Sequence, residues 1–478
     1  MHENLEGYRQ YLYGVLGFFV IEDHVLNIGN GLVTRSYLGE VWEMASGKVV
    51  NNIRNHSSYC TDTYLMLNIK NLIMLFAHTL QNYGYTVTPL HELLLEVKDH
   101  YNEVLMQKWV QVFRDIFEKD NYHPVQVETP EEFSRITEIF PYRDRNLEQA
   151  QFPKRFPFSM MVPKVFQEVK VYISACLEFS EDLNLSQTEK EDMVRKSTNL
   201  LLTRTLSGCL ATLIKRPGLR LLQLIQITIN TLHLEHANVL LEHYVAKLTG
   251  SIEDSSKPGL GRLQGKAMFK DIRGEAEEQI YIALRLKIDE FLDLASYDWM
   301  LAEPRGMSSY VLDLIAFLTS TFTAFTNLPV RVAQTACMSA CQYVAKCLMA
   351  MLLSEDVKQM SLAALEQVNL DVIQCEQFAA TEPVEGFEEG ALLMCFADLR
   401  QLLDLFMTED WSTYFHDYGS ENSKYLRVSP HNAIIVVEKL REGEKRGMFS
   451  ILKRSDKKKL LETVLKQLKQ LTQHQHAS

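Results

Sequence analysis

Residues 306–379 constrain the fold of this chain most strongly, because their sequence predicts three helices in series. Pro329 interrupts the pattern, so the first helix ends near residue 327 and the second runs from about residue 331 to residue 353. Ser361 suits the N-cap of a third helix over residues 362–378. The first helix carries one apolar stripe at helical spacing, formed by Val311, Leu314, Leu318, Phe322 and Phe325.

The second of these helices is expected to lie inside a bundle. Small side chains let two helix axes approach closely, and they fill the first half of its stripe. The stripe runs through Ala333, Cys337, Ala340, Cys341, Val344, Leu348 and Met351. The sequence of the three helices contains no recognisable nucleophile, metal cage or phosphate loop. We therefore expect a scaffold that presents a binding surface, not an enzyme.

The rest of the chain also reads as helical, apart from one segment rich in proline. With 21 glycines and 13 prolines in 478 residues the chain favours long helices, and no convincing strand is found. A capping box, Ser186 to Glu189, predicts a helix to about residue 215. Ser429 and Pro430 suit the start of another. The proline-rich sequence of residues 122–163 predicts extended chain on both sides of a short helix near residues 131–139.

The expected fold class is therefore all-α, an elongated rod of consecutive antiparallel helical bundles. The sequence divides into four predicted parts. They are an N-terminal helical bundle at 1–121, a Pro-rich connector at 122–163, a middle helical bundle at 164–300, and a C-terminal helical bundle with a basic last helix at 301–478.

Charge and cysteine content limit the classes of function. The formal net charge is −12, which is unfavourable for binding nucleic acid non-specifically. None of the eight cysteines forms a CxxC pair, and several lie in apolar helical stripes, which predicts free thiols in a reducing, cytoplasmic compartment. The apolar run at residues 12–21 is about half of what a membrane span needs. Any membrane association is expected to be peripheral.

Three groups of residues are of the types that carry metal, thiol or phosphate chemistry, and for each we prefer a structural interpretation. His233, His236 and His243 share one helix without the HExxH spacing of a zinc site, so we expect packing or surface histidines. For Cys337, Cys341 and Cys347 we expect core packing. Residues 259–266 lack the residues of a phosphate loop. We therefore predict no catalytic residue, no metal and no cofactor.

The C-terminal end is basic in an acidic chain. Residues 445–469 hold nine Lys and Arg against Asp456 and Glu462, nine minus two giving +7. Anionic lipid attracts such clusters by about 1 kcal/mol per Lys or Arg near the surface. Two interpretations stay open. The cluster is either the solvated face of the final helix or a binding site for anionic lipid or an acidic partner protein. The candidate residues for that site are Lys453, Arg454, Lys457, Lys458 and Lys459.

The third central helix carries a candidate partner surface. Glu366, Asn369 and Ile373 occupy one face at i, i+3 and i+7 spacing. Asparagine is a poor helix former in the middle of a helix, so its presence suggests contact with a partner. An exposed neutral residue is the alternative interpretation.

Several long strings resemble the exocyst complex component 6 family, which are vesicle-tethering subunits. The resemblance runs in register over nearly the whole chain, from about Asn4 to the final helix. The strings that carry it lie at residues 195–206 (RKSTNLLLTRTL), 295–300 (ASYDWM), 332–342 (VAQTACMSACQ), 369–379 (NLDVIQCEQFA), 398–406 (DLRQLLDLF) and 424–428 (KYLRV).

This resemblance implies a helical-rod tether that assembles with other exocyst subunits, most closely component 5, and links secretory or recycling vesicles to the plasma membrane. It also implies binding of a GTP-loaded Rab GTPase of recycling endosomes through the C-terminal helical region. The Rab-contacting asparagine of the family matches Asn369. The chain departs from the family at Val330, where glycine is expected, and at residues 250–266. Family members also carry a further N-terminal region.

Overall fold

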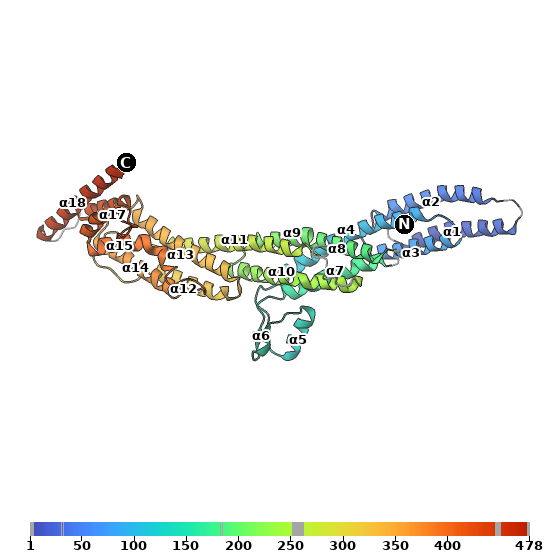
Figure 1. Cartoon of the computed structure of the whole chain (residues 1–478), viewed down its shortest axis with the longest axis horizontal. Helices are drawn as coiled ribbons and strands as arrows, with labels where there is room; N and C mark the ends of the chain where they lie inside the picture. Colours follow the sequence, from blue (N-terminus) through green and yellow to red (C-terminus); the bar gives the residue numbers. More distant parts are fainter. Residues whose placement is uncertain are drawn as a thin grey trace. The chain divides into compact units, whose positions relative to one another are not determined.

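The computed structural model describes residues 4–29, 31, 33–181, 183, 185–250, 262–444 and 451–475. The chain forms two compact units. Figure 1 labels most of the helices of both units. Unit 1 comprises Met1–Pro217 with Ile229–Glu275, and unit 2 comprises Gly218–Thr228 with Ala276–Ser478. Helices α10 (Leu221–Thr249) and α11 (Gly265–Leu292) contribute residues to both units.

Unit 1 is built from long helices, of which α4 packs against several others. Aromatic packing joins its first two helices, since the ring centroids of Phe19 and Trp42 lie 5.1 Å apart. The Trp42 indole N–H also donates a 2.8 Å hydrogen bond to the carbonyl of Thr86. The helices are α1 (Leu5–Ile28), α2 (Arg35–Ser57), α3 (Thr63–Asn82), α4 (Thr88–Lys119), α7 (Met161–Ser180), α8 (Gln187–Leu200), the π-helix η1 (Leu201–Leu206) and α9 (Ser207–Ile214).

The predicted capping box at the start of α8 is confirmed. The Ser186 side chain accepts from the Glu189 amide, and the Glu189 carboxylate accepts from the Ser186 amide. The sequence pattern predicts one continuous helix from here to about residue 215. The structure instead places the π-helix η1 between α8 and α9, and Leu201, Leu202, Thr205 and Leu206 of η1 are buried.

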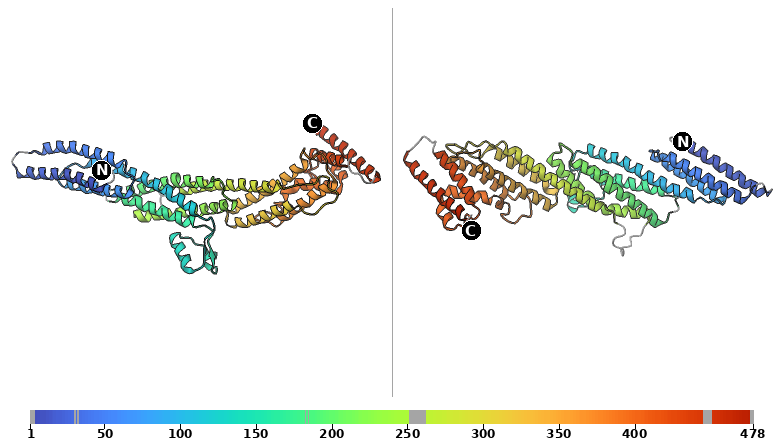
Figure 2. Two further views of the ribbon diagram at one scale, coloured as in Figure 1. Left: turned by 180° about the vertical axis from the view of Figure 1, so that it is seen from behind. Right: turned by 90° about the horizontal axis from the view of Figure 1, so that it is seen from above.

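Residues 122–163 fold more compactly than the sequence predicts. The short helix is confirmed as α5 (Pro130–Ile139), but the segment also contains α6 (Arg145–Gln149) and an antiparallel pair of two-residue strands, β1 (Gln126–Val127) and β2 (Lys154–Arg155). The expectation of otherwise extended chain was wrong, because aromatic side chains of the segment pack against each other, as Phe133 does on Phe156, and also against α7 and α10. Figure 2 (left) shows it projecting from the helices of unit 1.

Unit 2 contains the three predicted central helices. The apolar stripe of the first helix is buried, and the Ser361 hydroxyl accepts from the Ala364 amide at 3.1 Å, as predicted for an N-cap. The elements are α12 (Ser309–Ala324), the 3-10 helix η2 (Phe325–Asn327), α13 (Val330–Leu353), α14 (Leu362–Ala380), the 3-10 helix η3 (Leu393–Phe396), α15 (Ala397–Thr408), α16 (Trp411–His416), α17 (Pro430–Glu444) and α18 (Ile451–Gln475).

The all-α fold class is confirmed, and the predicted domain boundaries stay a prediction. By length and composition alone, residues 309–327 and α13 are apolar enough to cross a membrane. Each of the two has one face buried among neighbouring helices, for example at Leu314 and Cys337. We therefore interpret both as bundle helices, as their sequence stripes predict.

Candidate functional site

The candidate site is the outer face of α14 in unit 2. Glu366, Asn369 and Ile373 lie along this face, as their spacing predicts. Glu366 is exposed, whereas Asn369 and Ile373 are partly buried. The face therefore offers an acidic group, an amide and an aliphatic side chain within two turns of one helix.

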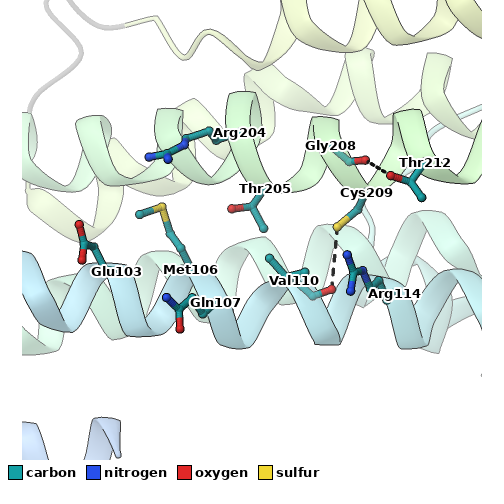
Figure 3. Close-up of a pocket in the computed structure, with 10 residues that line it drawn as sticks. All are labelled: Glu103, Met106, Gln107, Val110, Arg114, Arg204, Thr205, Gly208, Cys209 and Thr212. Carbon is teal, nitrogen blue, oxygen red and sulfur yellow. Dashed lines mark hydrogen bonds between the residues drawn. The ribbon is translucent and has the colours of Figure 1, made fainter. Parts of the chain in front are cut away.

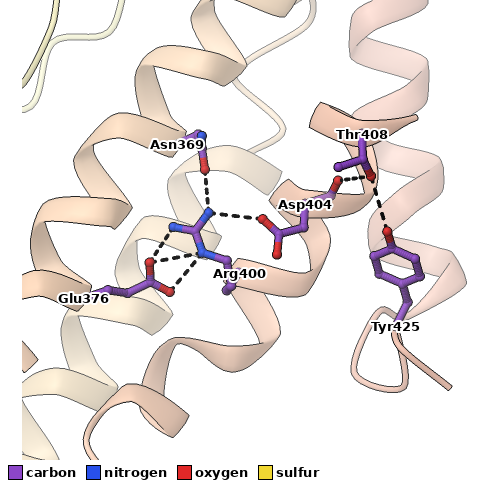
Figure 4. Close-up of polar contacts among 6 residues, drawn as sticks. All are labelled: Asn369, Glu376, Arg400, Asp404, Thr408 and Tyr425. Carbon is purple, nitrogen blue, oxygen red and sulfur yellow. Dashed lines mark hydrogen bonds and ion pairs between the residues drawn. The ribbon is translucent and has the colours of Figure 1, made fainter. Parts of the chain in front are cut away.

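An arginine on the neighbouring helix α15 holds this face in place (Figure 4). The Arg400 guanidinium donates from Nη1 to Oδ1 of Asn369 at 2.6 Å. Its Nε and Nη2 groups donate to the two carboxylate oxygens of Glu376, at 2.9 Å and 2.5 Å. A longer contact of 3.3 Å joins Nη1 to Asp404. One guanidinium thus links α14 to α15 and fixes the side chain of Asn369.

The surroundings of Arg400 keep it charged. Burial lowers its pKa, but hydrogen bonding and attraction to Glu376, together with Asp404, outweigh burial and raise the pKa above the ordinary value. The Arg400 and Glu376 side chains are 21% and 19% exposed, so solvent weakens their attraction less than at an open surface. Bidentate charge-assisted pairs of this kind are strong and directional.

The orientation of the Asn369 amide follows from this contact. Its oxygen accepts from Arg400, so its Nδ2 group is turned away from the guanidinium, which offers only donors. In the described part of the chain, Nδ2 has no hydrogen-bond partner of its own. Asn369 therefore presents a fixed donor at the surface of α14.

The inner face of α14 is held by a second polar network. Asp371 is fully buried and accepts from the Ser308 amide at 2.8 Å, the Ser308 hydroxyl at 2.6 Å and the Tyr297 hydroxyl at 2.6 Å. Gln367 accepts from the Arg305 amide at 2.9 Å. These contacts fasten the segment before α12 to α14.

Burial raises the pKa values of the two tyrosines in this network. The pKa of Tyr297 is raised by burial, by the neighbouring Tyr310 and by the Asp371 carboxylate. The pKa of Tyr310 is also raised, mainly by burial. Both hydroxyls therefore stay protonated and act as hydrogen-bond donors. The network is a rigid support behind the outer face.

The basic C-terminal cluster lies on and before α18. Lys445 and Arg446 lie outside the described residues, and Lys453 and Arg454 lie on α18 without described side chains. Lys457, Lys458 and Lys459 are exposed, while Val464, Leu465 and Leu468 are buried. The described part of α18 therefore buries apolar side chains and presents lysines outward.

The three histidines of the candidate metal group lie in different surroundings, since His236 and His243 are exposed and His233 is partly buried. The His233 ring packs edge-on against Tyr142 and Phe158, with centroids 5.4 Å and 5.2 Å away, and burial lowers its pKa to about 4. Among the residues that the structure describes, no group of three or more His, Cys, Asp or Glu side chains is placed to hold a metal ion. Cys337 and Cys341 are buried, and Cys347 is partly buried.

Sequence reasoning missed Arg400 and Glu376 as parts of the site. Glu376 lies on the same face as Asn369, but Arg400 is 31 residues further along the chain. Helical spacing identifies residues that share a face, and it gives no information on which residue of another helix meets them.

Comparison with known proteins places the chain in a family. Residues 89–439 match the family "Exocyst complex subunit Sec15 C-terminal". Exocyst complex component 6 of Canis lupus familiaris is 52% identical over 475 residues, which are 98% of this chain and 59% of that protein. Exocyst complex component 6 of Drosophila melanogaster is 47% identical over 477 residues, 100% of this chain and 62% of that protein.

A solved structure agrees with this assignment. The crystal structure of a Sec15 C-terminal domain is 41% identical, covers 66% of this chain and 98% of its own chain, and superposes with a TM-score of 0.52. The chain spans about 59% of the length of the first of these curated relatives. The extent of the family match and the level of identity lead to one conclusion: the chain belongs to the exocyst Sec15 C-terminal family.

Proposed function

We propose that the chain is a subunit of an exocyst vesicle-tethering complex and that the outer face of α14 binds a GTP-loaded Rab GTPase of recycling endosomes. The observation that carries the Rab proposal is the clamped Asn369, whose Oδ1 is held 2.6 Å from Arg400 Nη1. A side chain fixed before binding loses little conformational entropy in a complex, so its hydrogen bond contributes more to affinity.

The chemistry of the face suits a switch surface. Asn369 supplies a donor, Ile373 an apolar contact and Glu366 a negative charge. The GTPase supplies discrimination between nucleotides, because its switch loops are ordered by contacts to the γ-phosphate and are released after hydrolysis. The tether needs only to recognise the ordered loops.

Membership of the family supports a proposal for the wider role. We propose that other exocyst subunits, most closely component 5, hold the chain, and that its helical bundles form a rod between secretory or recycling vesicles and the plasma membrane. The chain would then be cytoplasmic and peripheral to both membranes. The relatives named exocyst complex component 6 support membership of the complex.

The Rab proposal is tested by calorimetry with a panel of Rab GTPases loaded with GTP analogue or GDP. Asn369→Ala should weaken binding of the GTP form about tenfold, as expected for loss of one well-placed hydrogen bond of about 1.4 kcal/mol. Asn422→Ala is a matched control, because Asn422 is exposed in a loop of the same unit. Equal affinity of Asn369→Ala and the control, with unchanged helical content, removes Asn369 from the site.

A second candidate function is binding of anionic lipid through α18. The observation that favours it is the run of exposed lysines, Lys457 to Lys459, for which the described residues supply no acidic partner. Flotation with vesicles of phosphatidylserine and phosphatidylcholine tests it. Changing the three lysines to alanine should reduce flotation, and equal flotation of parent and variant rejects this function.

A further inference from the structure

The charge on the last helix, α18, is almost all of one sign. From residue 457 to residue 475 it carries five lysines against Glu462, five minus one giving +4. The hollow of about 580 Å³ between α4 and the η1–α9 segment differs, because Glu103, Arg114 and Arg204 all line it and its charges are of both signs (Figure 3). Charge therefore favours no kind of ligand at that hollow, whereas it favours an anionic partner for α18.

Lysines and apolar side chains occupy opposite faces of α18. The apolar stripe follows helical spacing and consists of Leu461, Val464, Leu465, Leu468 and Leu471. The other side of the helix carries Lys458, Lys459, Lys466 and Lys469. A helix divided in this way suits the interface of an anionic membrane, where its apolar side chains enter the acyl boundary and its lysines contact the headgroups.

Packing against α17 keeps the apolar stripe away from any membrane. Val464, Leu465 and Leu468 are buried, because α18 packs mainly on α17. The lysines face outward, and only Lys469 forms an ion pair within the described residues, with Glu438 of α17 at 2.8 Å. The docked helix therefore offers a membrane its charge but not its apolar side chains.

The start of the described part of α18 makes few contacts with the rest of unit 2. Residues 457–460 are exposed, and Leu460 is 39% exposed. Leu460 and Leu461 border a hollow of about 40 Å³ that is also lined by Phe406, Trp411 and Leu440. Side chains around an unfilled hollow lose packing contacts on that side. Close packing of α18 is thus concentrated at residues 464–468, and little packing opposes its release.

We propose that α18 leaves α17 at an anionic membrane and lays its apolar stripe in the membrane interface, with its lysines against the headgroups. This inference rests on the lipid-binding function proposed for α18 and adds the conformational step that the binding requires. A membrane shifts the equilibrium because the released helix offers it the stripe and the lysines, whereas the docked helix offers the lysines alone. The membrane and α17 compete for the same apolar side chains.

Release of α18 also changes the surface at the start of α14. Leu362, the first residue of α14, lines the same hollow as Leu460 and Leu461. Leu362 shares a helix face with Glu366 and Asn369, because the three follow i, i+4 and i+7 spacing. Departure of α18 therefore uncovers one end of the outer face of α14.

Hydrogen exchange of the 478-residue chain, with and without vesicles, tests the release. The vesicles contain phosphatidylserine and phosphatidylcholine, and vesicles of phosphatidylcholine alone are the control. On the anionic vesicles, peptides from α17 should exchange at least about tenfold faster, because α18 no longer covers them. Peptides from α4 should not change. A helix that binds by its lysines while still docked would leave the exchange of α17 unchanged.

A cross-link between α17 and α18 tests the competition directly. Glu438→Cys and Lys469→Cys place two thiols where an ion pair joins the helices, and a short bis-maleimide can connect them. Peptide mapping identifies the linked product. The linked chain should bind anionic vesicles at least about tenfold more weakly than the same variant without the linker, which carries the same lysines. Leu440→Ala removes part of the surface under α18 without changing α18, and it should increase flotation.

The possible results separate this inference from the function on which it rests. Equal flotation of the linked and unlinked variants would overturn the release of α18, and so would unchanged exchange of α17 on vesicles that bind the chain. Lipid binding by the docked helix would then stand. Failure of the parent chain to float with anionic vesicles would instead remove the lipid-binding function and this inference with it.

Discussion

Replacing Asp371 by alanine should release the segment before α12 from α14. The fully buried Asp371 carboxylate accepts three hydrogen bonds, two from Ser308 and one from Tyr297, at 2.6–2.8 Å. Ser308 precedes α12, and its hydroxyl bonds to Asp371 and not to the helix backbone. Asp371→Ala therefore removes the partner of a backbone amide and of two hydroxyls at one point.

The size of the effect follows from these contacts. Each hydrogen bond to a charged group is worth about 1.5–3 kcal/mol. The two hydroxyls can turn toward other acceptors or water, whereas the Ser308 amide has a fixed direction. A local loss of about 3 kcal/mol is therefore expected, which corresponds to about a hundredfold faster amide exchange. Asp371→Asn should lose less, because it keeps one acceptor oxygen.

Hydrogen exchange measured by mass spectrometry is the assay, because it reports on this segment without requiring the two units to unfold together. Peptides that cover residues 296–309 should exchange about a hundredfold faster in Asp371→Ala than in the parent. Asp313→Ala is the control, since Asp313 is exposed on α12. Equal protection of the segment in Asp371→Ala and Asp313→Ala would refute the reasoning.

Two further predictions concern other buried contacts. A Cβ atom at Gly443 would lie 2.2 Å from the carbonyl oxygen of Met360, so Gly443→Ala should cost about 2 kcal/mol or more and lower the melting temperature, whereas Gly274→Ala should not. The pKa of His233 is lowered to about 4 by burial, so the unfolded state binds more protons between pH 6.5 and pH 4. The contribution of neutral His233 to the free energy of unfolding should therefore be fully present above pH 6.5 and fall by about 2 kcal/mol as the pH drops toward 4. Thermal melts of His233→Phe should show a smaller loss of stability over this pH range. An equal loss in parent and variant would contradict this.

Local patterns in the sequence predicted much of the fold. The apolar stripe from Val311 to Phe325, the break at Pro329 and the cap at Ser361 depend on residues within one or two turns of each other. Contacts of this range leave a clear signal in the spacing of side chains. The same holds for the placement of Glu366 and Asn369 on one face of α14.

Contacts between distant residues could not be predicted in this way. The aromatic packing that makes residues 122–163 compact joins Phe158 to His233, which is 75 residues further along the chain. The clamp on Asn369 comes from Arg400, on another helix. Neither contact alters the local pattern of polar and apolar residues. The signals that the sequence offered were the proline content of residues 122–163 and the asparagine in the middle of α14, Asn369.

The central claim is that the outer face of α14 binds the GTP form of a Rab GTPase. Its most direct test is the Kd of the 478-residue chain for GTP-loaded and GDP-loaded Rab GTPases of recycling endosomes, measured by calorimetry with the parent and with Asn369→Ala. The account predicts that the parent binds the GTP form at least about tenfold more tightly than the GDP form and that the variant loses this advantage. Equal affinity for the two nucleotide forms, or a variant that binds the GTP form as tightly as the parent, would contradict it.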